Sequence, residues 1–239
     1  MKPALFLKQT SASKVGFCVY DSAALTNLVD ENLWEFEPEG KSSYDFFEML
    51  ETKLQNNLES VVIGFFEVEQ SKKYGECNNA AQIKASAAKK GMGPKLYDGI
   101  MQWYGTLIPD RSFVSNAARG VWKYYSEKRK DVTKNSLDNV KSPKTPQKND
   151  DCQFIGDEES AFLNYSYSMG GESWLKPLQP VHVSVGKKIT GELAEAGMDA
   201  DPKDFDNFVY GICDKYFSQR FSTTESVKVT TLRKSILGG

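Results

Sequence analysis

Apolar and polar residues follow two periods along this chain, one typical of strands and one typical of helices. Strands are predicted where apolar residues run continuously or alternate with polar ones, at 15–20, 61–68, 80–87, 161–168 and 181–185, with a short extended stretch at Phe113–Val114. In 80–87 the alternation is regular, so alanine and isoleucine side chains face one side of the strand and polar side chains face the other. These segments supply the strands of a sheet.

Helical spacing of apolar residues predicts four helices. They cover 43–54 with Ser43 as the N-cap, 94–104 with Pro94 in the first turn, a segment capped by Ser115, and a C-terminal segment near 202–218. The last helix has an aromatic stripe, in which four aromatic side chains are joined by two aliphatic ones: Phe205, Phe208, Val209, Ile212, Tyr216 and Phe217. If this stripe were exposed to water, it would form a large apolar patch that promotes association. We therefore expect it to pack on its own chain, with a partner protein as the alternative.

This order of elements predicts an α/β fold with a mixed, mostly antiparallel central sheet flanked by helices. We expect this domain to span 1–185 and a C-terminal helical extension to span 186–239. Residues 133–152 contain two prolines and few apolar groups, so they are expected to form an exposed, mobile insertion.

The charges nearly balance, which excludes strong non-specific affinity for nucleic acid or anionic membrane. Among the 239 residues, 30 Lys and Arg oppose 32 Asp and Glu. The segment 1–70 is acidic and 119–148 is basic, which indicates either a solvated surface or an anion-binding face. The sequence contains no apolar run long enough for a membrane span and no signal peptide, and it therefore predicts a soluble protein.

The cysteines and the single histidine argue against metal and Cys–His chemistry. The four cysteines are widely separated, without a Cys-x-x-Cys pair, and only His182 could add an imidazole ligand. We therefore expect no metal, and reduced thiols in a cytosol. Cys18 and Cys213 are expected in the core, with Cys77 and Cys152 near loops.

The most informative motif is a glycine turn between a predicted strand and a predicted helix. Lys89-Lys90-Gly91-Met92-Gly93 joins 80–87 to 94–104, and backbone amides at a helix N-terminus bind anions. The cradle would use the amides of Gly91, Met92, Gly93 and Lys95, with Lys89 and Lys90 adding positive charge at the rim. Glycines at such turns are also common for steric reasons alone.

The strand, Gly-x-Gly turn and helix, followed by a helix reading Ser115-x-x-Ala118-x-x-Val121-Trp122, resemble the GNAT-type N-acetyltransferases. The family motif Arg/Gln-x-x-Gly-x-Gly/Ala aligns with Gly91 and Gly93 and places Ala88 at the Arg/Gln position. The resemblance implies a GNAT-like fold and an acetyl-CoA pyrophosphate held by Ala88, Lys89, Lys90, Gly91, Met92, Gly93 and Lys95. The segment 77–131 looks closer still to GNAT-like proteins of tailed bacteriophages, through Ser86–Asp98 and Asp110-Arg111.

The resemblance implies acetyl transfer to an amine of a protein or a small molecule. Glu67 is the expected base, with Glu69 beside it, although both are equally explained as ordinary strand-end carboxylates. Trp122 stands where many relatives place the tyrosine acid, so Tyr124 or Tyr125 would have to replace it.

This departure, and Ala88 in place of Arg or Gln, favour an alternative without catalysis. The chain would then be a phage protein that serves in the virion or binds and inhibits a host protein, located in the host cytoplasm or the virion. Asp110 and Arg111 are expected to form a buried ion pair that fixes a turn, or else a substrate-pocket pair.

Overall fold

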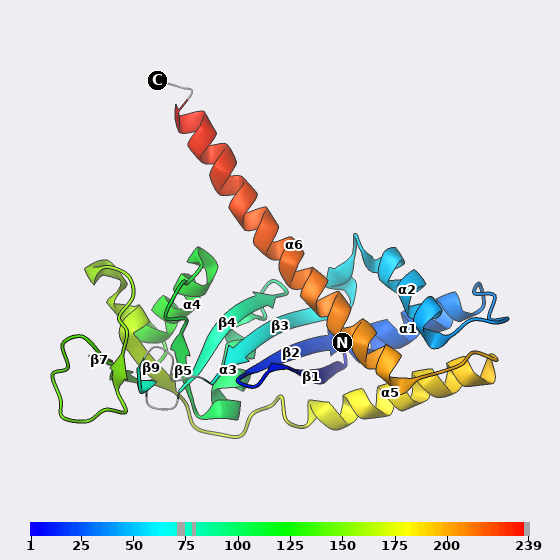
Figure 1. Cartoon of the computed structure of the whole chain (residues 1–239), viewed down its shortest axis with the longest axis horizontal. Helices are drawn as coiled ribbons and strands as arrows, with labels where there is room; N and C mark the ends of the chain where they lie inside the picture. The colour runs from blue at the N-terminus through cyan, green and yellow to red at the C-terminus, as the bar shows by residue number, and fades with distance from the viewer. Residues whose placement is uncertain (71–74, 78–79, 237–239) are drawn as a thin grey trace. The chain divides into compact units, whose positions relative to one another are not determined.

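The computed structural model describes residues 1–70, 75–77 and 80–236 and has a mixed α/β fold. Its strands are β1 (Pro3–Ser11), β2 (Lys14–Asp21), β3 (Val62–Glu69), β4 (Ala81–Ala88), β5 (Thr106–Pro109), β6 (Thr133–Ser136), β7 (Asp138–Asn139), β8 (Asp151–Cys152) and β9 (Tyr165–Ser168). Seven of them form one mostly antiparallel sheet in the order β1-β2-β3-β4-β5-β9-β6 (Figure 1), and β7 pairs with β8. The predicted fold class is confirmed.

Six α-helices accompany these strands in the described residues. They are α1 (Ser22–Leu33), α2 (Ser43–Leu54), α3 (Gly93–Tyr104), α4 (Asn116–Glu127), α5 (Leu178–Glu195) and α6 (Pro202–Ile236), with short 3-10 helices η1 (Leu58–Ser60) and η3 (Glu158–Asn164). The four predicted helices correspond to α2, α3, α4 and α6. Within the described residues, no helix is long and apolar enough to cross a membrane.

The chain forms two compact units. Unit 1 contains Met1–Phe6, Cys18–Phe65 and Pro180–Gly239, and unit 2 contains Leu7–Phe17 and Phe66–Gln179. Residues 237–239 of the predicted C-terminal extension lie outside the described residues.

The core of unit 1 lies between α2 and α6. Phe47 on α2 stacks on Phe208, with ring centroids 5.0 Å apart, and also contacts Phe205 at 6.0 Å. Phe205, Phe208, Val209, Ile212 and Tyr216 are all buried. The expectation that the aromatic stripe packs on its own chain is confirmed.

Ser43 has a different role from the predicted one. The N-cap of α2 is Ser42, whose amide donates to Asp45 Oδ2 at 2.8 Å in a capping box. Ser43 is the first helical residue and is buried, and its hydroxyl donates to Asp204 Oδ2 at 2.6 Å while it accepts from the amide of Asp201 at 3.0 Å. The side chain expected to cap its own helix therefore fixes the start of α6.

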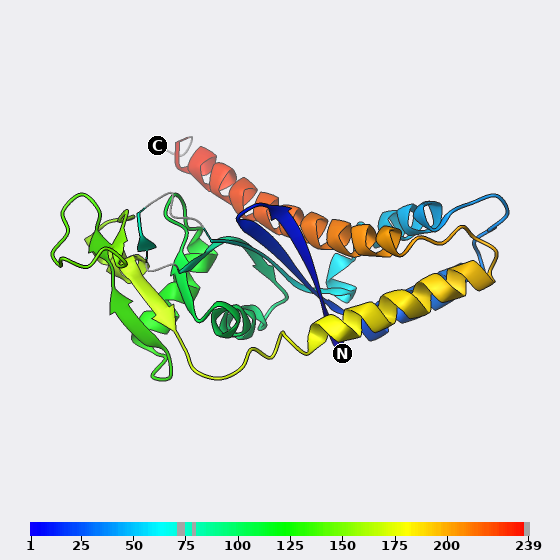
Figure 2. The same ribbon diagram turned by 60° about the horizontal axis from the view of Figure 1, so that its bottom comes forward.

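The predicted strand at 181–185 is wrong, because this segment belongs to α5. Figure 2 shows α5 and α6 running antiparallel to each other. The buried residues of α5 are His182, Ile189, Thr190 and Leu193, which follow the helical period, and Val183 is exposed. Five alternating residues fit either period, and burial against α6 selected the helix.

His182 is the centre of a polar chain in unit 1 that runs from the buried Tyr20 to the partly exposed Asp206. Its Nδ1 lies 3.0 Å from the Tyr20 hydroxyl, and its Nε2 lies 3.0 Å from Asp206 Oδ1. An ionised Asp206 can only accept, so Nε2 carries the proton and Nδ1 accepts from Tyr20. Burial lowers the pKa of His182 below its ordinary value, and Asp206 offsets part of this effect.

In unit 2, one predicted strand was wrong in part and one observed strand was not predicted. Phe113 and Val114 lie in a loop, and the strand after α3 is β5 (Thr106–Pro109), which begins directly after the C-cap Gly105. The predicted strand 161–168 is helical up to Asn164, in η3, and extended only in β9.

The expected loop at 133–152 is ordered at both ends. Residues 133–136 form the exposed edge strand β6, and the pair β7–β8 closes the segment, whereas 141–149 are exposed and outside any regular element. β6 pairs antiparallel with β9 along four consecutive residues of each strand. The segment is therefore an exposed loop on a strand-paired base.

The expectation of reduced thiols is wrong for this structure. Cys18 pairs with Cys213 in unit 1, and Cys77 pairs with Cys152 in unit 2, so none of the four cysteines is free. All four are buried, which agrees with the expected core positions of Cys18 and Cys213. The first disulfide joins β2 to α6 across 195 residues of sequence.

Acidification from pH 7.5 to 5.5 should lower the free energy of unfolding. The pKa of His182 is depressed in the folded state, so its contribution is complete above the unfolded pKa of about 6.5 and is lost as the pH falls below it. Urea denaturation at several pH values measures this slope, and His182→Gln should flatten it in this window. An equal slope in both proteins would contradict the assignment.

Removing the Cys18–Cys213 disulfide should destabilise unit 1 by about 2–4 kcal/mol, because the cross-link limits the unfolded ensemble. The measurement is urea denaturation of Cys77→Ala/Cys152→Ala with and without reductant, since only one disulfide remains in this variant. Cys18→Ala/Cys213→Ala in the same background is the control that reductant should not affect. A reductant-insensitive midpoint in the first variant would show that the cross-link is absent.

Candidate functional site

The turn between β4 and α3 lies in unit 2 and has the predicted strand–turn–helix form. The Met92 amide donates to the Lys89 carbonyl at 2.9 Å, and Gly91 has a φ of +84°, which a residue with a side chain rarely adopts. Helix α3 then begins at Gly93, with Pro94 in its first turn. An added Cβ at Gly91 or Gly93 would meet no atom within 4 Å, so open space lies over both glycines.

The backbone amides at this turn are unequal in their hydrogen bonding. The Met92 amide is used inside the turn, and the Leu96 amide donates to the Met92 carbonyl at 3.0 Å. Within the described part of the chain, the amides of Gly91, Gly93 and Lys95 have no acceptor. Of the four amides predicted to form a cradle, three therefore remain available for an anion, at the positive end of the α3 dipole.

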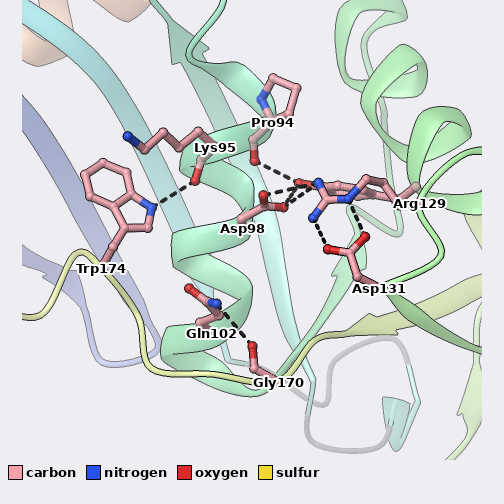
Figure 3. Close-up of polar contacts among 9 residues, drawn as sticks. Pro94, Lys95, Asp98, Gln102, Arg129, Asp131, Gly170 and Trp174 are labelled. Carbon is pink, nitrogen blue, oxygen red and sulfur yellow. Dashed lines mark hydrogen bonds and ion pairs between the residues drawn. The ribbon is translucent and has the colours of Figure 1, made fainter.

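The basic and apolar side chains predicted at this site surround the turn. Lys90 and Lys95 are exposed, whereas Lys89 and Ala88 are partly buried at the end of β4. Lys95 Nζ lies 5.0 Å from the ring centroid of Trp174, whose Nε1 donates to the Lys95 carbonyl at 3.0 Å (Figure 3). Trp174, which sequence reasoning did not identify, thus holds the first turn of α3 through its backbone.

β4 and β5 are paired in parallel over only part of β4. The register joins Ala81 to Leu107, Gln82 to Ile108 and Ile83 to Pro109. β5 ends at Pro109, so the remaining residues of β4, 84–88, continue to the turn without pairing to β5. Beyond its register with β5, β4 leads to the turn that carries the three amides.

A buried ionic cluster occupies the point where this pairing ends. Lys84 Nζ lies 2.7 Å from Asp110 Oδ1 and 3.7 Å from Glu69 Oε2, and all three side chains are mostly buried. Asp110 Oδ1 also accepts from the Ser112 amide at 2.8 Å. The carboxylate of Asp110 is therefore used to hold Lys84 and the loop after β5.

The expected Asp110–Arg111 ion pair is wrong. Arg111 is fully buried and donates from Nε to the Pro109 carbonyl at 2.9 Å, from Nη1 to Asn164 Oδ1 at 3.3 Å and from Nη2 to the Leu163 carbonyl. Burial lowers the pKa of Arg111 to about 10. Its guanidinium donates to carbonyls at the end of β5 and in η3, which precedes β9, so its role is structural.

The predicted base, Glu67, is already paired. Its Oε1 lies 2.9 Å from Lys14 Nζ, and this contact raises the pKa of Lys14. Glu69, the second carboxylate, contacts Lys84 and accepts from Ser13 Oγ at 3.4 Å. Both carboxylates therefore have cationic partners, as ordinary strand-end residues do.

The two predicted tyrosine acids lie in different surroundings. The Tyr124 side chain is exposed at 43%, whereas Tyr125 is buried. The Tyr125 hydroxyl lies 2.7 Å from Asp98 Oδ1 and 2.9 Å from the Pro94 carbonyl, next to the first turn of α3. Burial, and then the hydrogen bond to Asp98, raise the pKa of Tyr125 far above its ordinary value. A phenol of this kind holds its proton tightly.

Arg129 completes a charged network that holds α4 against α3. Its Nη1 lies 3.1 Å from both oxygens of Asp98, and its Nε and Nη2 each lie 2.7 Å from Asp131 (Figure 3). Pairing with Arg129 lowers the pKa of Asp131 to about 2. The fork of Arg129 thus joins the two carboxylates, and Asp98 in turn holds Tyr125.

The structure therefore brings Gly91, Gly93, Lys95 and the Tyr125 hydroxyl to one end of α3, and it places Glu67 in a separate pair with Lys14. Such an arrangement can bind an anionic group through backbone amides. Comparison of the chain with protein-family models, with curated proteins and with solved structures finds no match.

Tyr125→Phe should lower the free energy of unfolding by about 1–3 kcal/mol, because it removes a buried hydrogen bond to the Asp98 carboxylate. Tyr124→Phe is the matched control, and its effect should be below about 0.5 kcal/mol because that side chain is exposed. Urea denaturation of both variants makes the comparison. Equal effects would show that the Tyr125 hydroxyl does not stabilise the α3–α4 packing.

Proposed function

We propose that this chain binds acetyl-CoA at the β4–α3 turn and transfers its acetyl group to an amine of a protein or a small molecule. The observation that carries the proposal is the set of three free amides, from Gly91, Gly93 and Lys95, at the N-terminus of α3. A pyrophosphate needs several convergent donors and room for its oxygens, and the open space over both glycines supplies that room.

The strand edge beside the turn supports a ligand longer than a phosphate. Residues 85–88 of β4 lie beyond the register with β5, so their backbone donors and acceptors on this edge would be able to pair with an extended, amide-bearing chain. A parallel pair of strands joined through a Gly-x-Gly turn and α3 also agrees with the resemblance to the GNAT-type N-acetyltransferases. Acetyl-CoA, when bound, would supply an activated acetyl thioester.

The chain would give only weak acid–base assistance to this transfer. Glu67 could accept a proton from the attacking amine only after it releases Lys14. Tyr125 lies close to the turn, but its raised pKa makes it a weak acid, and exposed Tyr124 has no partner that would orient its hydroxyl among the described residues. Slow turnover is therefore expected.

A second candidate function is a GNAT-like phage protein without catalysis, acting in the virion or binding and inhibiting a host protein. The two buried disulfides favour it, because disulfides persist in oxidising surroundings such as a virion surface and are rare in a reducing cytoplasm. The paired state of both base candidates also agrees with it.

Calorimetric titration with CoA and acetyl-CoA tests the binding step. Gly93→Val should weaken binding at least tenfold, because its side chain would fill the space over the amides. Gly120→Val on α4 is the matched control, since that glycine is also helical and faces open space. Equal affinity of wild type and Gly93→Val would sink the assignment of the turn.

Release of CoA thiol in the presence of a lysine-rich peptide or spermidine separates the two functions. All four cysteines are in disulfides, so a thiol reagent should report CoA with little background from the protein. Binding with amine-dependent thiol release indicates the transferase. Binding without release indicates the non-catalytic protein.

A further inference from the structure

Unit 1 displays a tryptophan to solvent within a strongly acidic segment. Trp34 is 93% exposed, at the C-cap of α1. The acidic aromatic surface is defined as Trp34 with the exposed carboxylates within five residues of it in the sequence, which are Asp30, Glu31, Glu35, Glu37 and Glu39. Within 30–39 there is no lysine or arginine. Because Trp34 is almost fully exposed, nearly the whole indole ring is accessible to a partner.

The backbone that carries Trp34 is fixed on both sides. Asn32 is buried, and its Nδ2 donates to the Leu28 carbonyl at 2.7 Å. Phe36 packs edge-on against Phe46 of α2, with ring centroids 5.2 Å apart, and Lys41 Nζ lies 4.8 Å from the Phe36 ring centroid. Trp34 thus lies between two residues, Asn32 and Phe36, that contact the rest of unit 1.

Three features of this surface favour a positive charge. The indole face of tryptophan is the best aromatic partner for a cation. The C-terminal end of α1 carries the negative end of the helix dipole, and its last turn contains no basic residue. Five carboxylates add charge of the same sign, and the nearby Lys53 pairs with only one of them, Glu35, at 3.2 Å.

We infer that the acidic aromatic surface is a docking site for a lysine- or arginine-rich segment of another protein. A basic side chain would lie over the Trp34 ring, and its neighbours would pair with Glu37 and Glu39. Charge complementarity identifies the occupant, because an anionic or purely apolar partner would bring no positive charge to pair with these carboxylates. This inference is independent of the proposed acetyl transfer.

Fluorescence anisotropy with labelled octalysine and octa-arginine peptides tests the docking site, with labelled octaglutamate as the negative probe. Wild-type protein should bind both basic peptides and not the acidic one. Trp34→Ala should weaken binding roughly 2- to 5-fold, and Trp34→Phe should retain most of the affinity, because a phenyl ring still accepts a cation. Glu37→Gln/Glu39→Gln should weaken binding and reduce its salt dependence.

Val183→Ala is the matched control, because it removes another exposed apolar side chain of unit 1 outside this surface and should leave the affinity unchanged. Trp34 is almost fully exposed, so an unchanged melting temperature of Trp34→Ala confirms that the variant is folded. Equal peptide affinity of Trp34→Ala and wild type would overturn the inference, as would a failure of both basic peptides to bind. Light scattering that detects a Trp34-dependent dimer would assign the surface to a second copy of this chain instead.

Discussion

The geometry of unit 2 depends on one short parallel pairing, between β4 and β5. Parallel neighbours cannot be joined by a tight hairpin, so a crossover helix must connect them, and α3 is that helix. The pairing ends at Ile83 and Pro109, while β4 continues to residue 88. This mismatch in strand length places the last residues of β4 next to the Gly-x-Gly turn and the N-terminus of α3.

The charged groups around α3 act mainly as supports for this geometry. Asp98, Arg129 and Tyr125 hold α4 on α3, and Trp174 fixes the carbonyl of Lys95. Lys84 neutralises Asp110 where β4 and β5 separate. Because the side chains are used in this way, the ligand binding that we propose at the turn relies on backbone amides, which need no titratable group. The proposed anion binding is compatible with these side-chain contacts, whereas acid–base catalysis would need a side chain released from its present partner.

Unit 1 is organised by long-range contacts with α6. Three contacts join residues more than 150 positions apart: the Cys18–Cys213 disulfide, the Tyr20–His182 hydrogen bond and the Ser43–Asp204 hydrogen bond. A fourth, between His182 and Asp206, joins the neighbouring helices α5 and α6. Side chains of β2, α2, α5 and α6 meet in this core. The outer end of α1 takes no part in it, which leaves Trp34 available for a partner.

The sequence alone determined the elements whose period is long and regular. The helices at 43–54, 94–104 and 202–218 and the strands at 61–68 and 80–87 could be predicted because their side chains repeat one spacing over several turns or pleats. The Gly-x-Gly turn could be predicted as well, because only glycine adopts the φ of Gly91 without strain.

Tertiary structure decided the short and ambiguous elements. Residues 181–185 fit a strand or a helix, and packing against α6 made them helical. α1 was missed although Asp21 caps it and Leu25, Val29 and Asn32 share one buried face. Cysteine pairing, the partners of Glu67 and Arg111 and the exposure of Trp34 could not be read from the chain, because each depends on residues brought close only by the complete fold.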